Sequence, residues 1–236
     1  MKKCLLLMVM LTFPISATAR APSLDAVPEG AYRPLKAADS EAVEEGFEAA
    51  WLAVLGEQIG REIRLDRVSG QADLSFGAVD AGVTYYSSQI AALTAASAGP
   101  TKWKALSGET FCVTENSPHT DFVVSTYGGI PRTYPSAAHA LIGLKLGECQ
   151  AVVDDQVLLQ QIAFLPEWRR YNRLLPALDG QTLNLRIKAG DPVVQQQIER
   201  AASSPNTKET LASVTQQWID EVAFQAYVLA DTLDCH

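Results

Sequence analysis

Hydrophobic and polar positions follow two alternating periods in the middle of the chain, between Leu106 and Leu159. Short runs rich in β-branched and aromatic residues, at 110–113, 130–134 and 150–153, are separated by segments with apolar residues at helical spacing. Glycines end the helical segments. The pattern predicts strand and helix in unbroken alternation. Connections this short imply parallel strands with right-handed crossovers.

Two polar loops are predicted to lie at one edge of this sheet. In such a sheet the first strand commonly lies between the second and the third, and a ligand crevice forms where the chain leaves the first and third strands. One loop contains Asn116 and Ser117, and the other contains Asp154 and Asp155. A hydroxyl and a carboxylate facing one crevice predict a site for a small zwitterionic or cationic ligand. The alternative role for Asp155 is to cap the following helix, although Asp154 can take that cap instead.

The N-terminal residues have the order of features of a secretory signal peptide. Met1-Lys2-Lys3 is basic, residues 5–15 are apolar, and Ala17-Thr18-Ala19 is a small-x-small cleavage site. We therefore predict a signal peptide at residues 1–19 and an exported mature protein. No later run is long and apolar enough to span a membrane. A net charge of −8 without a basic cluster argues against nucleic acid as a partner.

Export to an oxidising compartment makes a disulfide the natural interpretation of the cysteines that follow the signal peptide. Cys112 lies in the first predicted strand and Cys149 at the start of the third, so pairing of these strands brings their Cα atoms within bonding range. We predict a Cys112–Cys149 disulfide, against the alternative of two buried free thiols, with Cys235 left over. No CxxC motif occurs and the three histidines show no ligand spacing, so neither a metal site nor a cofactor is predicted.

The flanking segments predict a second unit. Residues 22–40 are rich in Pro, Ala and Asp, and we expect an extended arm there rather than a strand. Residues 46–60 carry a helical apolar stripe and residues 62–68 alternate as in a half-covered strand. A return strand is predicted at 183–188 and a long final helix at 211–233.

The central motifs resemble the second lobe of bacterial family 3 solute-binding proteins, the periplasmic receptors of polar amino-acid ABC transporters. The order and spacing agree over roughly fifty residues. The matching motifs are Leu106-Ser-Gly108, Asn116-Ser117, Tyr134-x-Ser136, Ala140-Leu141, Leu146-Gly147 and Ala151-Val-Val-Asp-Asp155. The resemblance implies a two-lobed, periplasmic-binding-protein-like α/β fold with mixed, mostly parallel sheets flanked by helices.

The resemblance also implies that the first lobe is reduced. Gly70-Gln-Ala-Asp73 resembles the family's Gly-x-x-Asp, which is followed in the family by a helix whose arginine binds the ligand carboxylate. Here the chain runs directly into Tyr85-Tyr86, which resembles the Pro-Tyr-Tyr before the interlobe strand. Tyr86 is therefore expected either at the cleft or packed within the strand.

The expected division of the chain is a signal peptide at 1–19, lobe 1 from 22–88 plus 180–236, and lobe 2 with the interlobe strands from 89–179. The implied function is a periplasmic receptor that captures a small polar solute, such as an amino acid, for the permease of an ABC transporter. Its expected ligand-binding residues are Asp155, Ser117, Asn116, Tyr86 and Asp154, with Asp155 pairing with a ligand amine and Ser117 with an oxygen.

The alternative function is a ligand-poor accessory or sensor-type periplasmic protein of the same fold that binds a protein partner. The missing arginine and the long terminal helix motivate this alternative. An enzyme is not expected, because the chain has no Ser-His-Asp order and no metal motif. His119 beside the crevice is a candidate acid or base, but an isolated histidine after a turn more often lies on the surface.

Overall fold

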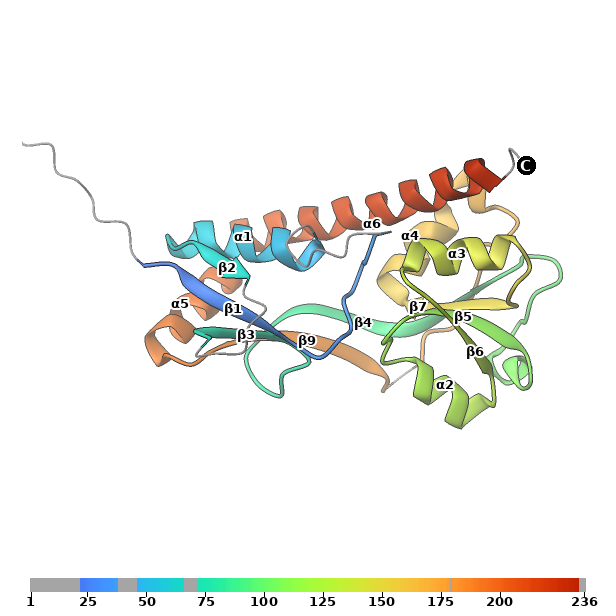
Figure 1. Cartoon of the computed structure of the whole chain (residues 1–236), viewed down its shortest axis with the longest axis horizontal. Coiled ribbons are helices and arrows are strands. Elements are labelled where there is room, and N and C mark those ends of the chain that lie inside the picture. The colour runs from blue at the N-terminus through green and yellow to red at the C-terminus, as the bar shows by residue number, and fades with distance from the viewer. Residues whose placement is uncertain (1–21, 38–45, 66–71, 179, 234–236) are drawn as a thin grey trace, which may run out of the picture.

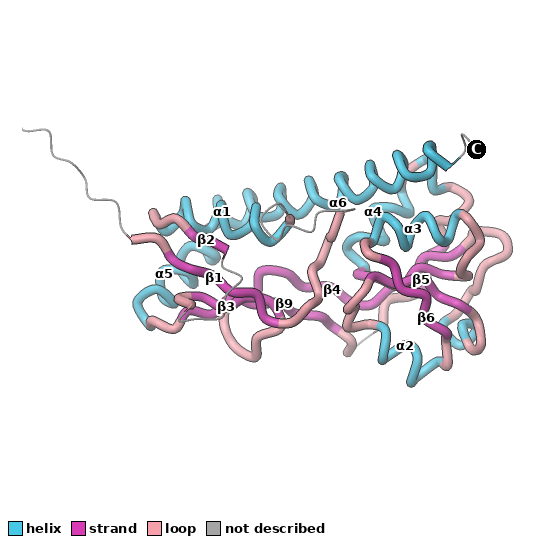
Figure 2. Tube along the Cα trace, in the orientation of Figure 1, coloured by secondary structure: helices cyan, strands magenta, loops and turns pink. Residues whose placement is uncertain are grey.

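The computed structural model describes residues 22–37, 46–65, 72–178 and 180–233. The predicted signal peptide and Cys235 lie outside these residues. Two groups of elements lie side by side along the long axis of the molecule, and strand β4 (Val83–Thr94) runs from one group into the other (Figures 1 and 2). We call them lobe 1 and lobe 2, with the proposed boundaries at residues 89 and 179.

Lobe 1 is built on strands in the order β2-β1-β3-β9. These strands are β1 (Leu24–Glu29), β2 (Ile63–Leu65), β3 (Leu74–Gly77) and β9 (Thr182–Ala189). β1 pairs in parallel with β2 and β3, whereas β9 pairs antiparallel with β3 and with the first half of β4. Two helices, α1 (Phe47–Ile59) and α5 (Pro192–Ser203), pack against β2 and β9 respectively.

Strand β1 corrects the expectation of an extended arm at residues 22–40. The Pro, Ala and Asp content of this segment argued for an arm, and the strand does contain Pro28, which cannot donate to a ladder. The amide of Leu24 donates to the carbonyl of Glu62 beside β2, whereas the carbonyl of Glu29 accepts from Ala78 after β3, so alternate residues of β1 face β2 and β3. Pro28 faces the β2 side, and in the described residues β1 pairs with β2 only from Leu24 to Ala26, so this pairing does not require a donor at Pro28.

The first lobe is reduced as predicted. β3 ends at Gly77 and β4 begins at Val83, with no helix in the described residues between them. β4 is a single long strand whose residues pair first with β9 and then, from Ile90 onward, with β7 of lobe 2. The two lobes therefore share one continuous sheet path, and the predicted two-lobed α/β fold is confirmed.

Lobe 2 contains the predicted alternation of strands and helices. In chain order its main elements are β5 (Thr110–Thr114), α2 (Thr120–Tyr127), β6 (Ile130–Tyr134), α3 (Ala137–Lys145), β7 (Ala151–Asp155), α4 (Gln156–Phe164) and β8 (Arg173–Leu175). β5 lies between β6 and β7 and is parallel to both, as the predicted sheet order requires. Short 3-10 turns, η2 (Trp103–Leu106) and η3 (Pro166–Trp168), precede β5 and β8.

The terminal helix α6 (Pro205–Leu233) connects the two lobes on one side of the molecule. It packs against α1 and α5 of lobe 1 and against α3 and α4 of lobe 2 (Figure 1). Its buried residues, Ile219, Val222, Ala223 and Ala226, recur at helical spacing and form one face. Among the described residues, no helix combines the length and apolar character needed to cross a membrane.

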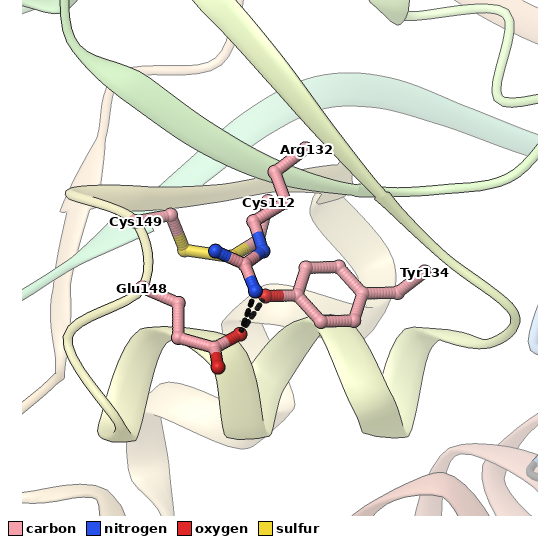
Figure 3. Close-up of a disulfide and its surroundings, with 5 residues drawn as sticks. All are labelled: Cys112, Arg132, Tyr134, Glu148 and Cys149. Carbon is pink, nitrogen blue, oxygen red and sulfur yellow. Dashed lines mark hydrogen bonds and ion pairs between the residues drawn. A yellow bond between two sulfur atoms is a disulfide. The ribbon is translucent and has the colours of Figure 1, made fainter.

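The predicted disulfide between Cys112 and Cys149 is confirmed, with Cα atoms 5.6 Å apart. Figure 3 shows a polar group beside it, in which Glu148 accepts a hydrogen bond from the Tyr134 hydroxyl and pairs with Arg132 at 3.0 Å. Partial burial and the neighbouring Glu148 raise the pKa of Tyr134 to about 12. The disulfide therefore ties Cys149, just before β7, to Cys112 in β5, beside the polar group of Arg132, Tyr134 and Glu148.

Helix α3 approaches the disulfide so closely that only glycine fits at Gly143. A Cβ built at Gly143 would lie 2.8 Å from the Sγ atom of Cys112 and 2.6 Å from Cζ of Tyr134. We predict that Gly143→Ala lowers the free energy of unfolding by about 1–3 kcal/mol through overpacking. Gly190→Ala is the control, because its Cβ meets nothing nearer than 3.9 Å. Urea denaturation of both variants measures the difference, and equal stabilities would contradict this packing.

Candidate functional site

The carboxylate of Asp155 lies between the lobes and is bound by three side chains of the protein itself. It sits at the end of β7, and the residue is only 1% exposed. Oδ2 accepts hydrogen bonds from the hydroxyls of Tyr32 at 2.8 Å and Tyr86 at 2.7 Å. Oδ1 lies 2.8 Å from Nε2 of His119. Asp155 occupies the N-cap position of α4 but makes no side-chain cap bond, so its side chain serves this cluster instead.

The three partners of Asp155 come from different parts of the fold. Tyr32 follows β1, Tyr86 lies in β4, and His119 immediately precedes α2. The segment that carries Tyr32, residues 30–37, passes between the lobes from the end of β1 toward α6 (dark blue in Figure 1). The rings of Tyr32 and His119 meet edge to face, with centroids 6.4 Å apart. We call Asp155, Tyr32, Tyr86 and His119 the Asp155 cluster.

Asp154 supports the cluster from inside lobe 2. Its side chain is buried and accepts hydrogen bonds from the backbone amide of Asp155 at 2.7 Å and from the Thr114 hydroxyl at 3.3 Å. Burial, followed by the neighbouring charge of Asp155, raises the pKa of Asp154 to about 7. Asp154 therefore holds the end of β7 in place rather than facing an opening.

The loop after β5 places its two expected ligand residues differently. Ser117 is buried, and its Oγ accepts a hydrogen bond from the backbone amide of His119 at 3.3 Å. Asn116 is exposed and adopts a left-handed φ of 60°, a conformation that asparagine tolerates better than most residues. The structure thus brings Ser117 and Asp155 together through His119, whereas Asn116 forms the turn outside the cluster.

A second buried carboxylate lies in lobe 1. Glu48 of α1 pairs with Arg33 at 3.3 Å and accepts a hydrogen bond from the Tyr85 hydroxyl. Burial raises the pKa of Glu48, and Arg33 opposes that rise. The strand register shifts between Thr84 and Tyr86, and both tyrosine rings contact α1, Tyr85 at Trp51 and Tyr86 at Phe47. The Tyr85 hydroxyl donates to Glu48, whereas the Tyr86 hydroxyl donates to Asp155. Tyr85 and Tyr86 are adjacent in the sequence but donate hydrogen bonds to two different buried carboxylates.

Sequence reasoning missed Tyr32, Arg33 and Glu48, and it expected His119 on the surface. His119 is 2% exposed. Tyr32 and Arg33 follow a strand that was not recognised, although Leu24 and Ala26 show the alternation that marks one. Knowing that strand would have placed a tyrosine and an arginine at the crevice, where parallel strands end.

The polar atoms of the Asp155 cluster bind one another rather than facing an open pocket. The carboxylate of Asp155 already has three side-chain partners, Tyr32, Tyr86 and His119. Because Asp155 is only 1% exposed, a ligand ammonium could reach the carboxylate only if one of these partners moved away. Ser117 contacts the backbone of His119 rather than its ring, so no Ser-His-Asp relay is formed. Within the described part of the chain, no group of three or more His, Cys, Asp or Glu residues is placed to hold a metal ion.

The raised pKa of Asp154 predicts a pH-dependent stability. The folded protein holds a proton that the unfolded chain releases at about pH 4, so the free energy of unfolding falls as the pH rises from about 4 through about 7. Asp154→Asn keeps an acceptor for the Asp155 amide and removes this titration. Urea denaturation across that range should give a flatter profile for Asp154→Asn than for wild type. The exposed Asp121→Asn control should follow wild type, and parallel profiles for all three would contradict the assignment.

Comparison with known proteins identifies the fold. No protein-family model and no curated protein matches the chain. Among solved structures, the periplasmic VFT2 domain of Bordetella pertussis BvgS matches with a TM-score of 0.58 and 18% identity, over 83% of this chain and 93% of that one.

Two further structures match to a similar extent. An ancestral arginine-binding protein bound to arginine gives a TM-score of 0.58 at 16% identity, over 85% of this chain and 99% of that one. The second substrate-binding domain of Lactococcus lactis GlnP gives 0.52 at 18% identity, over 87% and 97%. The predicted resemblance is confirmed at the level of the fold: the chain has the two-lobed fold of the family 3 solute-binding domains.

Proposed function

We propose that this chain is a non-catalytic periplasmic module of the solute-binding fold that is held closed by its own side chains and acts by binding a protein partner. The observation that carries the proposal is the hydrogen bond from Tyr32 of lobe 1 to Asp155 of lobe 2. It places a tyrosine hydroxyl where the family resemblance expects a ligand amine. The module therefore needs no small molecule to satisfy its buried carboxylate.

Helix α6 supports the same conclusion. Solute-binding folds capture ligands by hinge closure, which requires the lobes to move relative to one another. α6 packs on helices of both lobes, and opening would separate its buried face from one of them. Exposing buried apolar surface costs about 25 cal/mol per Å², so this helix opposes opening.

The periplasmic location rests on two observations. The disulfide between Cys112 and Cys149 fits an oxidising compartment, and the N-terminal residues have the pattern of a signal peptide. The similar VFT2 domain of BvgS is itself described as periplasmic.

A second candidate function is capture of a small polar solute, such as an amino acid, for an ABC transporter permease. Two of the structurally similar proteins are an arginine-binding protein and a substrate-binding domain. In this chain Asp155 and Tyr86, with Ser117 behind His119, converge between the lobes. Solute capture would require an open form in which Tyr32 leaves Asp155.

A ligand screen separates the two functions. We predict that wild-type protein shows no saturable thermal shift with amino acids, polyamines or small organic acids, because Asp155 is 1% exposed and is covered by Tyr32, Tyr86 and His119. A saturable shift that Asp155→Ala abolishes would overturn the proposal in favour of solute capture. If no solute binds, a photo-crosslinker placed at exposed positions of the intact protein in periplasmic extract should trap one protein reproducibly.

Removing the Tyr32 hydroxyl should weaken the contact between the lobes. We expect Tyr32→Phe to lower the free energy of unfolding by about 1–3 kcal/mol, because a buried carboxylate oxygen loses a donor. Tyr227→Phe is the matched control, since Tyr227 is 52% exposed on α6. Urea denaturation measures both variants. Equal stabilities for the two would show that the Tyr32 hydrogen bond does not hold the lobes together.

The role of α6 is tested by charging its buried face. Val222→Asp places a carboxylate at a fully buried position, whereas Val228→Asp places one at a position that is 41% exposed. We expect Val222→Asp to speed amide hydrogen exchange in α6 and in the helices it covers, α1, α3 and α4. Val228→Asp should leave exchange close to wild type. Unchanged protection in Val222→Asp would contradict a bridging role for α6.

A further inference from the structure

A cavity of about 290 Å³ lies in lobe 1, away from the Asp155 cluster. It is formed where α1, the start of β4, the end of α5 and the first turns of α6 meet, on the side of lobe 1 that α6 covers (Figure 1). Its lining residues are Trp51, Thr84, Tyr85, Ala202, Lys208, Leu211, Ala212 and Thr215. Its volume is close to the lower end of the range of small-molecule sites.

The apolar wall of the cavity is formed by the partly buried Tyr85 and Leu211. Trp51 lies behind Tyr85: it is 2% exposed, and its ring lies 5.0 Å from that of Tyr85 at an angle of 44°, so it holds the Tyr85 ring in place. The hydroxyl of Tyr85 is already directed to Glu48, so Tyr85 offers the cavity its ring rather than a donor. Leu211 completes an apolar surface suited to a flat hydrophobic group.

The mouth of the cavity is polar and carries one positive charge. Thr84, Lys208 and Ala212 are the exposed lining residues. The Thr215 hydroxyl donates to the carbonyl of Leu211 at 3.0 Å, which leaves Lys208 as the charged donor among the lining residues. The Lys208 ammonium favours an anionic group at the mouth, although the net charge of −8 opposes anions at longer range.

We propose that this cavity binds a small aromatic carboxylate, with the ring against Tyr85 and Leu211 and the carboxylate at Lys208. The site lies apart from the interlobe crevice and does not depend on the proposed function. It is also connected to the closed state, because Tyr85 contacts Glu48, which pairs with Arg33 in the segment between the lobes. A ligand ring bound in the cavity would pack directly on Tyr85, the residue that contacts Glu48.

Phenylacetate is the probe for the site, and benzylamine, which has a similar ring and the opposite charge, is its control. Titration of the full mature chain, followed by amide chemical shifts, should give saturable changes for phenylacetate at Tyr85, Lys208 and Leu211. Lys208→Gln should weaken phenylacetate binding about two- to fivefold, the range expected for one exposed ion pair, and leave benzylamine unaffected.

A second pair of variants tests the cavity itself. Ala212→Phe fills the mouth and should abolish binding, whereas Ser213→Phe places the same ring at an adjacent exposed position outside the cavity lining and should leave binding intact. Circular dichroism and thermal melts establish that both variants fold. Absence of saturable shifts at up to about 10 mM phenylacetate, or equal binding by Ala212→Phe and wild type, would overturn the proposal.

Discussion

A buried carboxylate needs donors, and much of this fold's arrangement follows from how Asp155 obtains them. Leaving such a charge unpaired in a low-dielectric interior costs several kcal/mol, so the folded state must supply partners from water, from a ligand or from the protein. Here the partners are Tyr32, Tyr86 and His119. Because these residues come from lobe 1, the connecting strand and lobe 2, satisfying one side chain also fixes the relative position of the lobes.

Features of three different physical kinds contribute to joining the two lobes. Strand β4 runs through both lobes and hydrogen-bonds to strands of each. The Tyr32–Asp155 hydrogen bond is a polar contact between the lobes, and the packing of α6 on helices of both lobes is an apolar one. A strand alone permits hinge bending, because few residues need to change conformation. The polar and apolar contacts lie away from the strand and oppose that bending.

Lobe 2 could be predicted from the sequence because its signals are local. The runs at β5, β6 and β7, the glycines that end α2 and α3, and the cysteines on neighbouring strands each act within a few residues or across one strand pair. The Asp155 cluster could not be predicted in full, because Tyr32 meets Asp155 across 123 positions of sequence. The error at β1 came from composition: the Pro, Ala and Asp of residues 22–40 argue against a strand, whereas β1 is held by pairing with β2 and β3, which are distant in the sequence.

The position of Asp155 shows why a residue's role cannot be carried over with its motif. The run Ala151–Asp155 folds as the resemblance implies and delivers a carboxylate to the space between the lobes. What that carboxylate does depends on residues outside the motif, since a single hydroxyl at Tyr32 occupies the direction from which an amine would approach. Loss of the arginine-bearing helix and gain of an internal donor act in the same direction: one removes a contact to a ligand carboxylate, and the other removes the need for a ligand amine. Under the proposed function, both changes lie in the first lobe, whereas the second lobe keeps the strand and helix pattern on which the resemblance rests.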